Sequence, residues 1–145
     1  MDLHIDDFYK DVSKTWVYLY QSFPSKCELF VEDICGYEAA DEFGLHSRRH
    51  MACLGAFLWL EEEGFIRHQG LIRQEGVDQA ILTSRSFLLL AKPIVDLDEM
   101  EASNIEPLNK TLAEPAIDAI RAALKEQSTF KINRLVSTLL AKQSR

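Results

Sequence analysis

Arg48 to Thr83 is the stretch that decides the fold, and at its centre lies the run Met51-Ala52-Cys53-Leu54-Gly55-Ala56-Phe57-Leu58-Trp59-Leu60-Glu61-Glu62-Glu63-Gly64-Phe65-Ile66. The first ten residues of this run carry no charge and no amide or hydroxyl side chain. The run is too long for an ordinary strand and too short to span a bilayer. Leu, Ala, Met and Glu favour a helix, and Gly64 stands where a helix C-terminus needs a left-handed residue. The stretch therefore predicts a helix that is capped by Ser47 and ends at Gly64.

The chain changes character after this helix, over residues 65–83. Gly70 and Gly76 stand among apolar residues that favour strands, and Glu75-Gly76-Val77-Asp78 has the composition of a turn. We expect a two-stranded hairpin here. Leu82 and Thr83 then open another short helix, which Pro93 closes.

This succession of helix, hairpin and short helix resembles the winged helix-turn-helix superfamily over roughly residues 8–91, a span of domain size. The runs that carry the resemblance are Leu60-Glu61-Glu62-Glu63-Gly64-Phe65-Ile66 and Ala80-Ile81-Leu82-Thr83-Ser84-Arg85-Ser86-Phe87-Leu88-Leu89-Leu90. They are similar to the end of the recognition helix and the exit from the wing in bacterial repressor-like domains. The resemblance implies a mainly α fold with a small β-wing. Such a fold serves protein contacts as well as DNA.

The other elements are expected in the following order. A first helix over residues 6–22, capped by Asp6 or Asp7, precedes a short strand at 26–29 and a short helix at 30–35 that Gly36 stops. Residues 37–46 are longer than a tight helix-turn-helix connection and leave room for an extra helical turn. Three parts are predicted: a winged-helix domain (1–92), an acidic linker (93–103), and a C-terminal helical hairpin (104–145) that packs on the domain or forms a dimer interface.

Composition sets bounds on the class of protein. The chain has 145 residues, 47% of them hydrophobic and 27% charged, and a net charge of −7, which is typical of a globular protein. The net charge divides into −7 for residues 1–45, +1 for 46–92, −6 for 93–118 and +5 for 119–145. No signal peptide, transmembrane run or cysteine pairing motif is recognised, so we expect a cytoplasmic protein without membrane contact.

Basic and polar side chains gather at the start of the long helix and in the hairpin. A winged helix places the first turn of this helix in the major groove, and its wing reaches flanking phosphates. Arg48 and Arg49 suit guanine or phosphate contact, and Arg67 and Arg73 suit backbone contact, although an ordinary helix start also exposes charge. The predicted DNA-binding residues are Ser47, Arg48, Arg49, His50, Arg67, His68, Arg73 and Arg85.

One pattern argues against DNA, because the long helix is apolar all round. Four of its residues are expected in the core: Cys53, Ala56, Phe57 and Leu60. Their helical neighbours then face outward: Met51, Leu54, Gly55 and Leu58. We expect this face to be covered by the C-terminal hairpin, by a second subunit or by a different protein. The predicted protein interface comprises Met51, Leu54, Leu58, Leu135 and Leu139.

Metal binding and catalysis have little support in the sequence. His46, His50 and Cys53, preceded by Glu42, are weakly suggestive of a metal site. If Ser47 caps the helix, however, His46 lies outside it and the helical spacing argument fails. We predict no metal site and no cofactor. No phosphate loop, nucleophile elbow or His-Glu-x-x-His motif occurs, so we predict that the protein is not an enzyme.

The sequence thus predicts a winged-helix DNA-binding protein that acts as a transcriptional regulator. It would bind double-stranded DNA as a homodimer assembled through the first and last helices. The alternative is a winged-helix protein–protein interaction subunit that binds a partner protein and no DNA.

Overall fold

The computed structural model describes residues 2–94 and 114–142. Helices predominate, and four strands form one small antiparallel sheet, which confirms the predicted class of a mainly α protein with a small β component. In chain order the elements are α1 (Leu3–Ser22), β1 (Cys27–Phe30), α2 (Val31–Cys35), α3 (Arg48–Glu62), β2 (Ile66–Arg67), β3 (Leu71–Ile72), β4 (Gly76–Leu82), α4 (Ser84–Ala91), α7 (Ala116–Glu126) and α8 (Thr129–Lys142).

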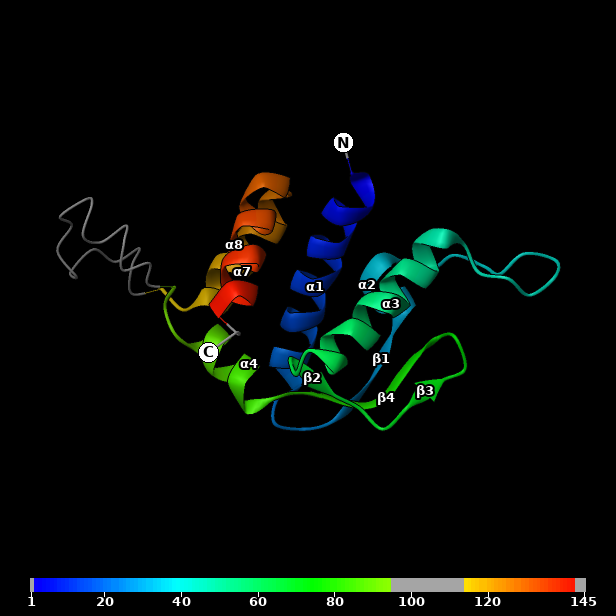
Figure 1. The fold of residues 1–145 in the computed structure, drawn as a ribbon, viewed down its shortest axis with the longest axis horizontal. Helices are drawn as coiled ribbons and strands as arrows, with labels where there is room; N and C mark the ends of the chain where they lie inside the picture. Colours follow the sequence, from blue (N-terminus) through cyan, green and yellow to red (C-terminus); the bar gives the residue numbers. More distant parts are fainter. Residues whose placement is uncertain (1, 95–113, 143–145) are drawn as a thin grey trace, which may run out of the picture.

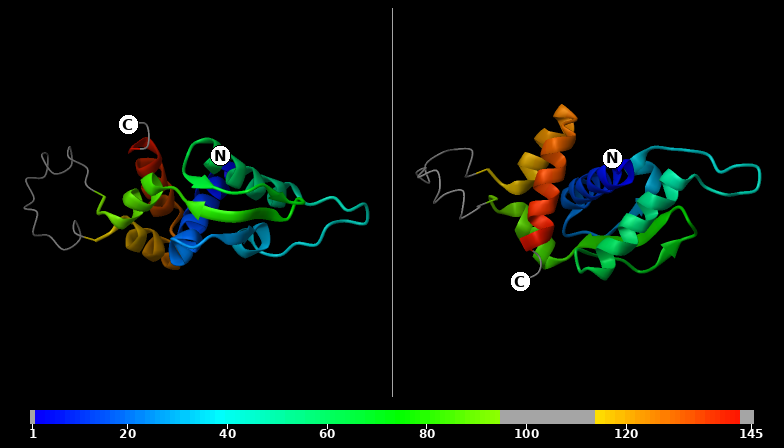
Figure 2. Two further views of the ribbon diagram at one scale, coloured as in Figure 1. Left: turned by 90° about the horizontal axis from the view of Figure 1, so that it is seen from below. Right: turned by 45° about the horizontal axis from the view of Figure 1, so that its top comes forward.

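Helix α1 is the centre of the molecule. It lies between α3 on one side and the pair α7 and α8 on the other (Figures 1 and 2). Val12, Trp16 and Leu19 follow the helical repeat and are at most 1% exposed, so α1 supplies core to both sides. The helix begins at Leu3 after Asp2, whose side chain makes no capping bond, so the predicted caps at residues 6 and 7 are wrong.

The sheet is built around β4, which pairs with every other strand. Cys27 of β1 lies opposite Ala80, Ile66 of β2 lies opposite Leu82, and Leu71 of β3 lies opposite Val77. The strand predicted at residues 26–29 is therefore present, and it joins the hairpin sheet. This pairing holds the hairpin against the N-terminal part of the chain.

The turn between β3 and β4 is residues 73–75, where Arg73 adopts a left-handed conformation with φ of 50°. The predicted turn at residues 75–78 is wrong, because Gly76 already begins β4. Gly76 serves close strand packing rather than turning, since a Cβ at this position would collide with the Leu29 backbone of β1.

Helix α3 has the predicted ends. The Ser47 Oγ accepts a hydrogen bond from the His50 backbone N–H at 3.0 Å, and Gly64 follows the helix with φ of 82°. Helix α2 likewise stops at Gly36, which has φ of 94°. The extra helical turn considered for residues 37–46 is absent, because this segment contains bends and turns only.

The C-terminal helices form the predicted hairpin, and they pack on the same chain. Pro115 precedes α7, and the Ser128 Oγ accepts a hydrogen bond from the Lys131 backbone N–H at 3.2 Å at the start of α8. Both helices contact α1, and Val136 and Leu139 are at most 1% exposed there. The predicted acidic linker from residue 95 onward, and the first part of the predicted C-terminal extension up to residue 113, lie outside the described residues.

Candidate functional site

Helix α3 has one face in the core and one face on the surface. Cys53, Ala56, Phe57 and Leu60 are at most 3% exposed, which confirms their predicted inward direction. Leu54 is 4% exposed, so its predicted outward direction is wrong. The core-facing arc is wide enough to include Leu54, because α3 contacts α2 and β2 as well as α1.

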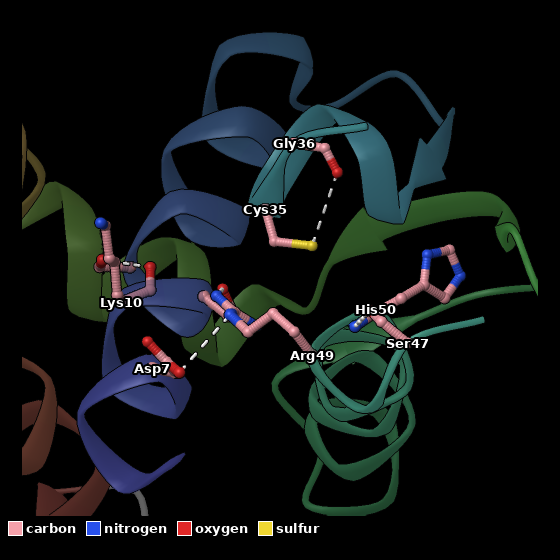
Figure 3. Close-up of polar contacts among 9 residues, drawn as sticks. Asp7, Lys10, Cys35, Gly36, Ser47, Arg49 and His50 are labelled. Carbon is pink, nitrogen blue, oxygen red and sulfur yellow. Dashed lines mark hydrogen bonds and ion pairs between the residues drawn. The ribbon is translucent and has the colours of Figure 1, made fainter. Parts of the chain in front are cut away.

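Arg49 belongs to the inward side of the molecule. Its Nη1 and Nη2 atoms donate hydrogen bonds to the two carboxylate oxygens of Asp11 at 2.7 and 2.6 Å, and its Nε lies 3.5 Å from Asp7 (Figure 3). The Asp11 side chain is only 2% exposed. These hydrogen bonds raise the pKa of Arg49 above its usual range, although partial burial opposes the shift. Arg49 thus joins α3 to α1, and its guanidinium is engaged by these two carboxylates.

The outward face of α3 is apolar. We call it the α3 outer face, and it consists of Met51, Ala52, Gly55, Leu58 and Trp59. Leu58 is half-buried, and the other four members are exposed, with Met51 at 38% and Trp59 at 36%. The C-terminal hairpin does not cover this face, because α7 and α8 lie across α1 from α3 (Figure 2). Among the described residues of the chain, no other element covers the α3 outer face in place of the hairpin.

A second apolar surface precedes α3, and sequence reasoning missed it. Residues 36–47, which we call the projecting loop, extend away from the helices (Figure 1). The Asp41 carboxylate accepts hydrogen bonds from the backbone N–H groups of Phe43 and Leu45 at 2.8 and 2.9 Å, which shapes the tip. Tyr37, Phe43 and Leu45 are 62–79% exposed. Three large apolar side chains in residues 37–46 were the available signal, but this segment was interpreted only as the connection before the long helix, with room for an extra helical turn.

The predicted DNA contacts are scattered. Arg48, Arg67 and Arg73 are exposed on the start of α3, on β2 and on the β3–β4 turn. Arg85 lies in α4, at the opposite end of the sheet from β3 (Figure 1), beside a hollow that Leu139 and Lys142 of α8 also line. Ser47 is occupied as the helix cap. The structure therefore does not gather the eight predicted residues on one surface.

Two of the predicted histidine contacts are turned inward. The His68 side chain is 6% exposed, its Nδ1 accepts a hydrogen bond from the Gly70 N–H at 3.0 Å, and its Nε2 lies 3.5 Å from the Glu61 carboxylate. His50 is 4% exposed, and its Nε2–H donates to the Gln74 carbonyl oxygen at 2.7 Å. His50 therefore ties the start of α3 to the β3–β4 turn rather than pointing to solvent.

The His50 ring is part of a cluster with His46 and Glu75. The two imidazole rings stack with centroids 3.8 Å apart and an interplanar angle of 7°. The His46 Nε2 lies 2.7 Å from the Glu75 Oε2. One ligand atom from each of the three side chains lies within 4.8 Å of the others. His46 is outside α3, as the Ser47 cap requires, yet its ring reaches His50.

Cys53 is not part of this cluster, contrary to the weak pattern in the sequence. It is fully buried in the core, and burial raises the pKa of its thiol well above the usual range. A neutral buried thiol is inert toward metals, which bind the thiolate. Glu42 is exposed on the projecting loop and is not a member of the cluster either.

The predicted interface residues fall into different environments. Met51 and Leu58 lie on the α3 outer face, whereas Leu54 and Leu139 are in the core of the same chain. Leu135 is half-buried on α8. The first and last helices, which were predicted to join two subunits, contact each other within one chain.

Comparison of the chain with models of protein families, with curated proteins and with solved structures gives no match. Among residues 2–94 and 114–142, no helix combines the length and the apolar character needed to cross a membrane. The functional argument therefore depends on the surfaces and side-chain clusters of this chain.

Proposed function

We propose that this chain is a winged-helix protein–protein interaction subunit and that the α3 outer face is its contact surface. The order helix, strand, helix, helix and then three strands (α1, β1, α2, α3, β2, β3, β4) supports the winged-helix assignment, as does the central position of β4 between β1 and β2. In this arrangement α3 occupies the place of the recognition helix, and the β3–β4 hairpin occupies the place of the wing.

The observation that carries the proposal is the composition of the α3 outer face around Gly55. A glycine inside a helix costs about 1 kcal/mol relative to alanine. Gly55 has an ordinary helical φ, and a Cβ added there would meet no atom of the chain within 4 Å, so the fold itself does not need glycine at this position. Glycine between the exposed side chains of Met51 and Trp59 lets another molecule approach the helix backbone closely.

Charge around this face indicates which partner suits it. Glu62 and Glu63 are exposed at the end of α3, and the N-terminal 45 residues carry a net charge of −7. Phe8 of α1 contacts the Trp59 ring at a centroid distance of 5.3 Å, which places the acidic first turns of α1 beside this face. A partner with an apolar centre and a basic rim complements this surface, whereas a second copy of the chain would bring acidic groups together.

Gly55 also provides the test. Glu at this position favours the helix and meets no neighbour, so Gly55→Glu should fold while placing a charge in the centre of the contact surface. Gly55→Ala is the matched control with a minimal side chain. A partner captured by the wild-type chain is purified, and its Kd for each variant is measured by calorimetry. We expect Gly55→Glu to weaken binding at least a hundredfold and Gly55→Ala to weaken it less than Gly55→Glu.

Two outcomes would contradict this proposal. Equal affinity of the wild type and Gly55→Glu for every captured partner would remove the α3 outer face from the function. A mass that doubles with concentration, and that Gly55→Glu returns to the monomer, would show that a second copy occupies the face. Sedimentation of the purified chain distinguishes this homodimer from a complex with another protein.

DNA binding is the second candidate, and one observation favours it. Arg48, Arg67 and Arg73 are exposed on the three elements that a winged helix presents to a duplex. Against it stand the apolar α3 outer face and the engagement of Arg49 by Asp11. Anisotropy of labelled genomic fragments across a salt series tests this function. Tight binding that falls steeply with salt, and that Arg48→Ala/Arg73→Ala weakens, would favour DNA over a protein partner.

A further inference from the structure

We propose that His46, His50 and Glu75 form a binding site for a divalent transition-metal ion of the zinc class. The site lies where the end of the projecting loop, the first turn of α3 and the β3–β4 turn meet. It is separate from the α3 outer face, and it does not depend on the proposed protein contact.

The ligand set is one that zinc uses. Two imidazole nitrogens and one carboxylate oxygen make a three-residue set that leaves a further position open in tetrahedral coordination. The three ligand atoms lie within 4.8 Å of one another, and ligands at about 2.0–2.1 Å from a tetrahedral zinc ion lie about 3.3 Å apart, so the most separated pair would have to approach by about 1.5 Å. Only small side-chain movements are therefore needed, and the 2.7 Å hydrogen bond between His46 and Glu75 shows that the two groups already meet.

The partners of His50 fit the role of a metal ligand. Its Nε2–H donates to the Gln74 carbonyl oxygen at 2.7 Å, which assigns the proton to Nε2 and leaves the lone pair on Nδ1. Histidine ligands of metals usually donate their second ring N–H to a carbonyl or carboxylate in this way, which orients the ring. The hydrogen bond is supplied by the residue that precedes Glu75, so the same turn orients one ligand and provides another.

His46 gives an independent observation. Its side chain is only 9% exposed, and its Nδ1 is a buried atom with no hydrogen-bond partner. A buried ring nitrogen without a partner is costly, so the hydrogen bonds of the fold do not fully satisfy this ring. Because Nε2 is the His46 atom that faces Glu75, it is the nitrogen that would bind an ion together with Glu75. The stacked His50 ring adds a second imidazole at 3.8 Å, an arrangement that repels if both rings are protonated and that a shared cation stabilises.

The space beside the cluster admits an ion and further ligands. A hollow of about 200 Å³ opens onto both histidines and Glu75, and its walls include Glu32 of α2 and Glu38 of the projecting loop. Both residues thus line the same hollow as the three proposed ligands. The hollow thus offers entry from solvent and additional negative charge for a divalent cation.

The site would join three segments of the chain through one ion. His46 lies near the end of the projecting loop, His50 is in the first turn of α3, and Glu75 ends the turn before β4. An ion held by all three stabilises the folded chain and fixes the loop that presents Phe43 and Leu45. Metal binding would therefore change the rigidity of the projecting loop.

The experiment is a titration of the metal-free full chain with ZnCl2 by calorimetry and by equilibrium dialysis. We expect one Zn2+ per chain with micromolar or tighter Kd, and a rise in Tm with added Zn2+. Glu75→Gln removes a proposed ligand at an exposed position, and His46→Gln removes one that lies outside α3. Each should weaken Zn2+ binding tenfold or more. His4→Gln changes an exposed histidine at the start of α1 and should bind as the wild type does.

The cysteines require their own control, because Cys35 is half-buried and carries a thiol. Cys35→Ser should retain Zn2+ binding if the proposed ligands are correct. Loss of binding in Cys35→Ser, together with retention in His46→Gln, would overturn the proposal in favour of a thiol site. Absence of stoichiometric Zn2+ binding by the folded wild type would overturn it outright, as would unchanged binding by both ligand variants.

Discussion

Two apolar helix faces of this chain differ in their exposure to solvent. The face of α8 that contains Val136 and Leu139 is buried in the core of the same chain, where α8 contacts α1 and α7, whereas the α3 outer face with Met51 and Trp59 remains exposed. Both faces follow a helical repeat in the sequence, and both were expected to be buried against another element of the chain or against another molecule. The chain provides the cover for α8 by placing α7 and α8 on the free side of α1 (Figure 1).

The difference teaches that an apolar stripe indicates burial without naming the partner. The α8 stripe is amphipathic, with lysine and arginine on its other side, as expected for a helix that packs once. Helix α3 is apolar on nearly all sides, and one domain can bury only part of such a helix. The part left exposed is therefore the better candidate for an intermolecular contact.

The largest expected effect concerns the buried face of α8. Leu139→Ala leaves a cavity in the core beneath α8, and it should lower the free energy of unfolding by about 2–4 kcal/mol. Phe130→Ala, on the same helix at 72% exposure, should change it by less than about 0.5 kcal/mol. Urea denaturation followed by circular dichroism measures both. Equal small effects would mean that α8 does not pack on α1 in solution.

The next effect separates two adjacent arginines that look alike in the sequence. Arg49→Met leaves the buried Asp11 carboxylate without its partner and should cost about 2–3 kcal/mol, at or below the low end for buried pairs because the Arg49 head is partly exposed. Arg48→Met changes an exposed side chain and should cost less than about 0.5 kcal/mol. Similar unfolding free energies for both variants would contradict the Asp11–Arg49 pair.

Local patterns in the sequence were sufficient for much of the fold. The Ser47 cap, the Gly36 and Gly64 stops, and the inward residues of α3 are set by neighbours a few positions away, and these predictions are confirmed. The turn at residues 75–78 was wrong because Gly76 is explained by β1, whose Leu29 is 47 positions away. A pattern within a short window of sequence cannot show which distant strand packs against a glycine.

The candidate site was less predictable for the same reason. The ion pair of Arg49 joins residues 38 positions apart, and Glu75 meets His46 across 29 positions. The sequence placed the two histidines near each other but offered Cys53 and Glu42 as their companions. The apolar residues of the projecting loop were visible in the sequence, but the sequence did not show that the segment projects from the helices and leaves them exposed.

A smaller effect of opposite sign concerns the centre of the exposed face. Gly55→Ala should raise the free energy of unfolding by about 0.5–1 kcal/mol, because alanine favours the helix and its Cβ meets no atom within 4 Å. Thermal and urea unfolding of the purified chain measure the gain. A loss of stability would mean that the backbone at Gly55 is already in close contact, for example within a homodimer present during the measurement.

The smallest expected effect tests most directly the contrast between the exposed α3 outer face and the buried face of α8. Met51→Glu introduces a charge on the α3 outer face at a side chain that is 38% exposed, and it should change the free energy of unfolding by less than about 0.5 kcal/mol. The equivalent change on the buried stripe, Val136→Glu, buries a carboxylate and should prevent stable folding. Urea unfolding of Met51→Glu at two protein concentrations, tenfold apart, provides the measurement.

A cost above 1 kcal/mol that appears only at the higher concentration would mean that a second copy covers Met51. A cost of that size at both concentrations would mean that the chain itself buries Met51, and the contrast between the two helix faces would then be wrong.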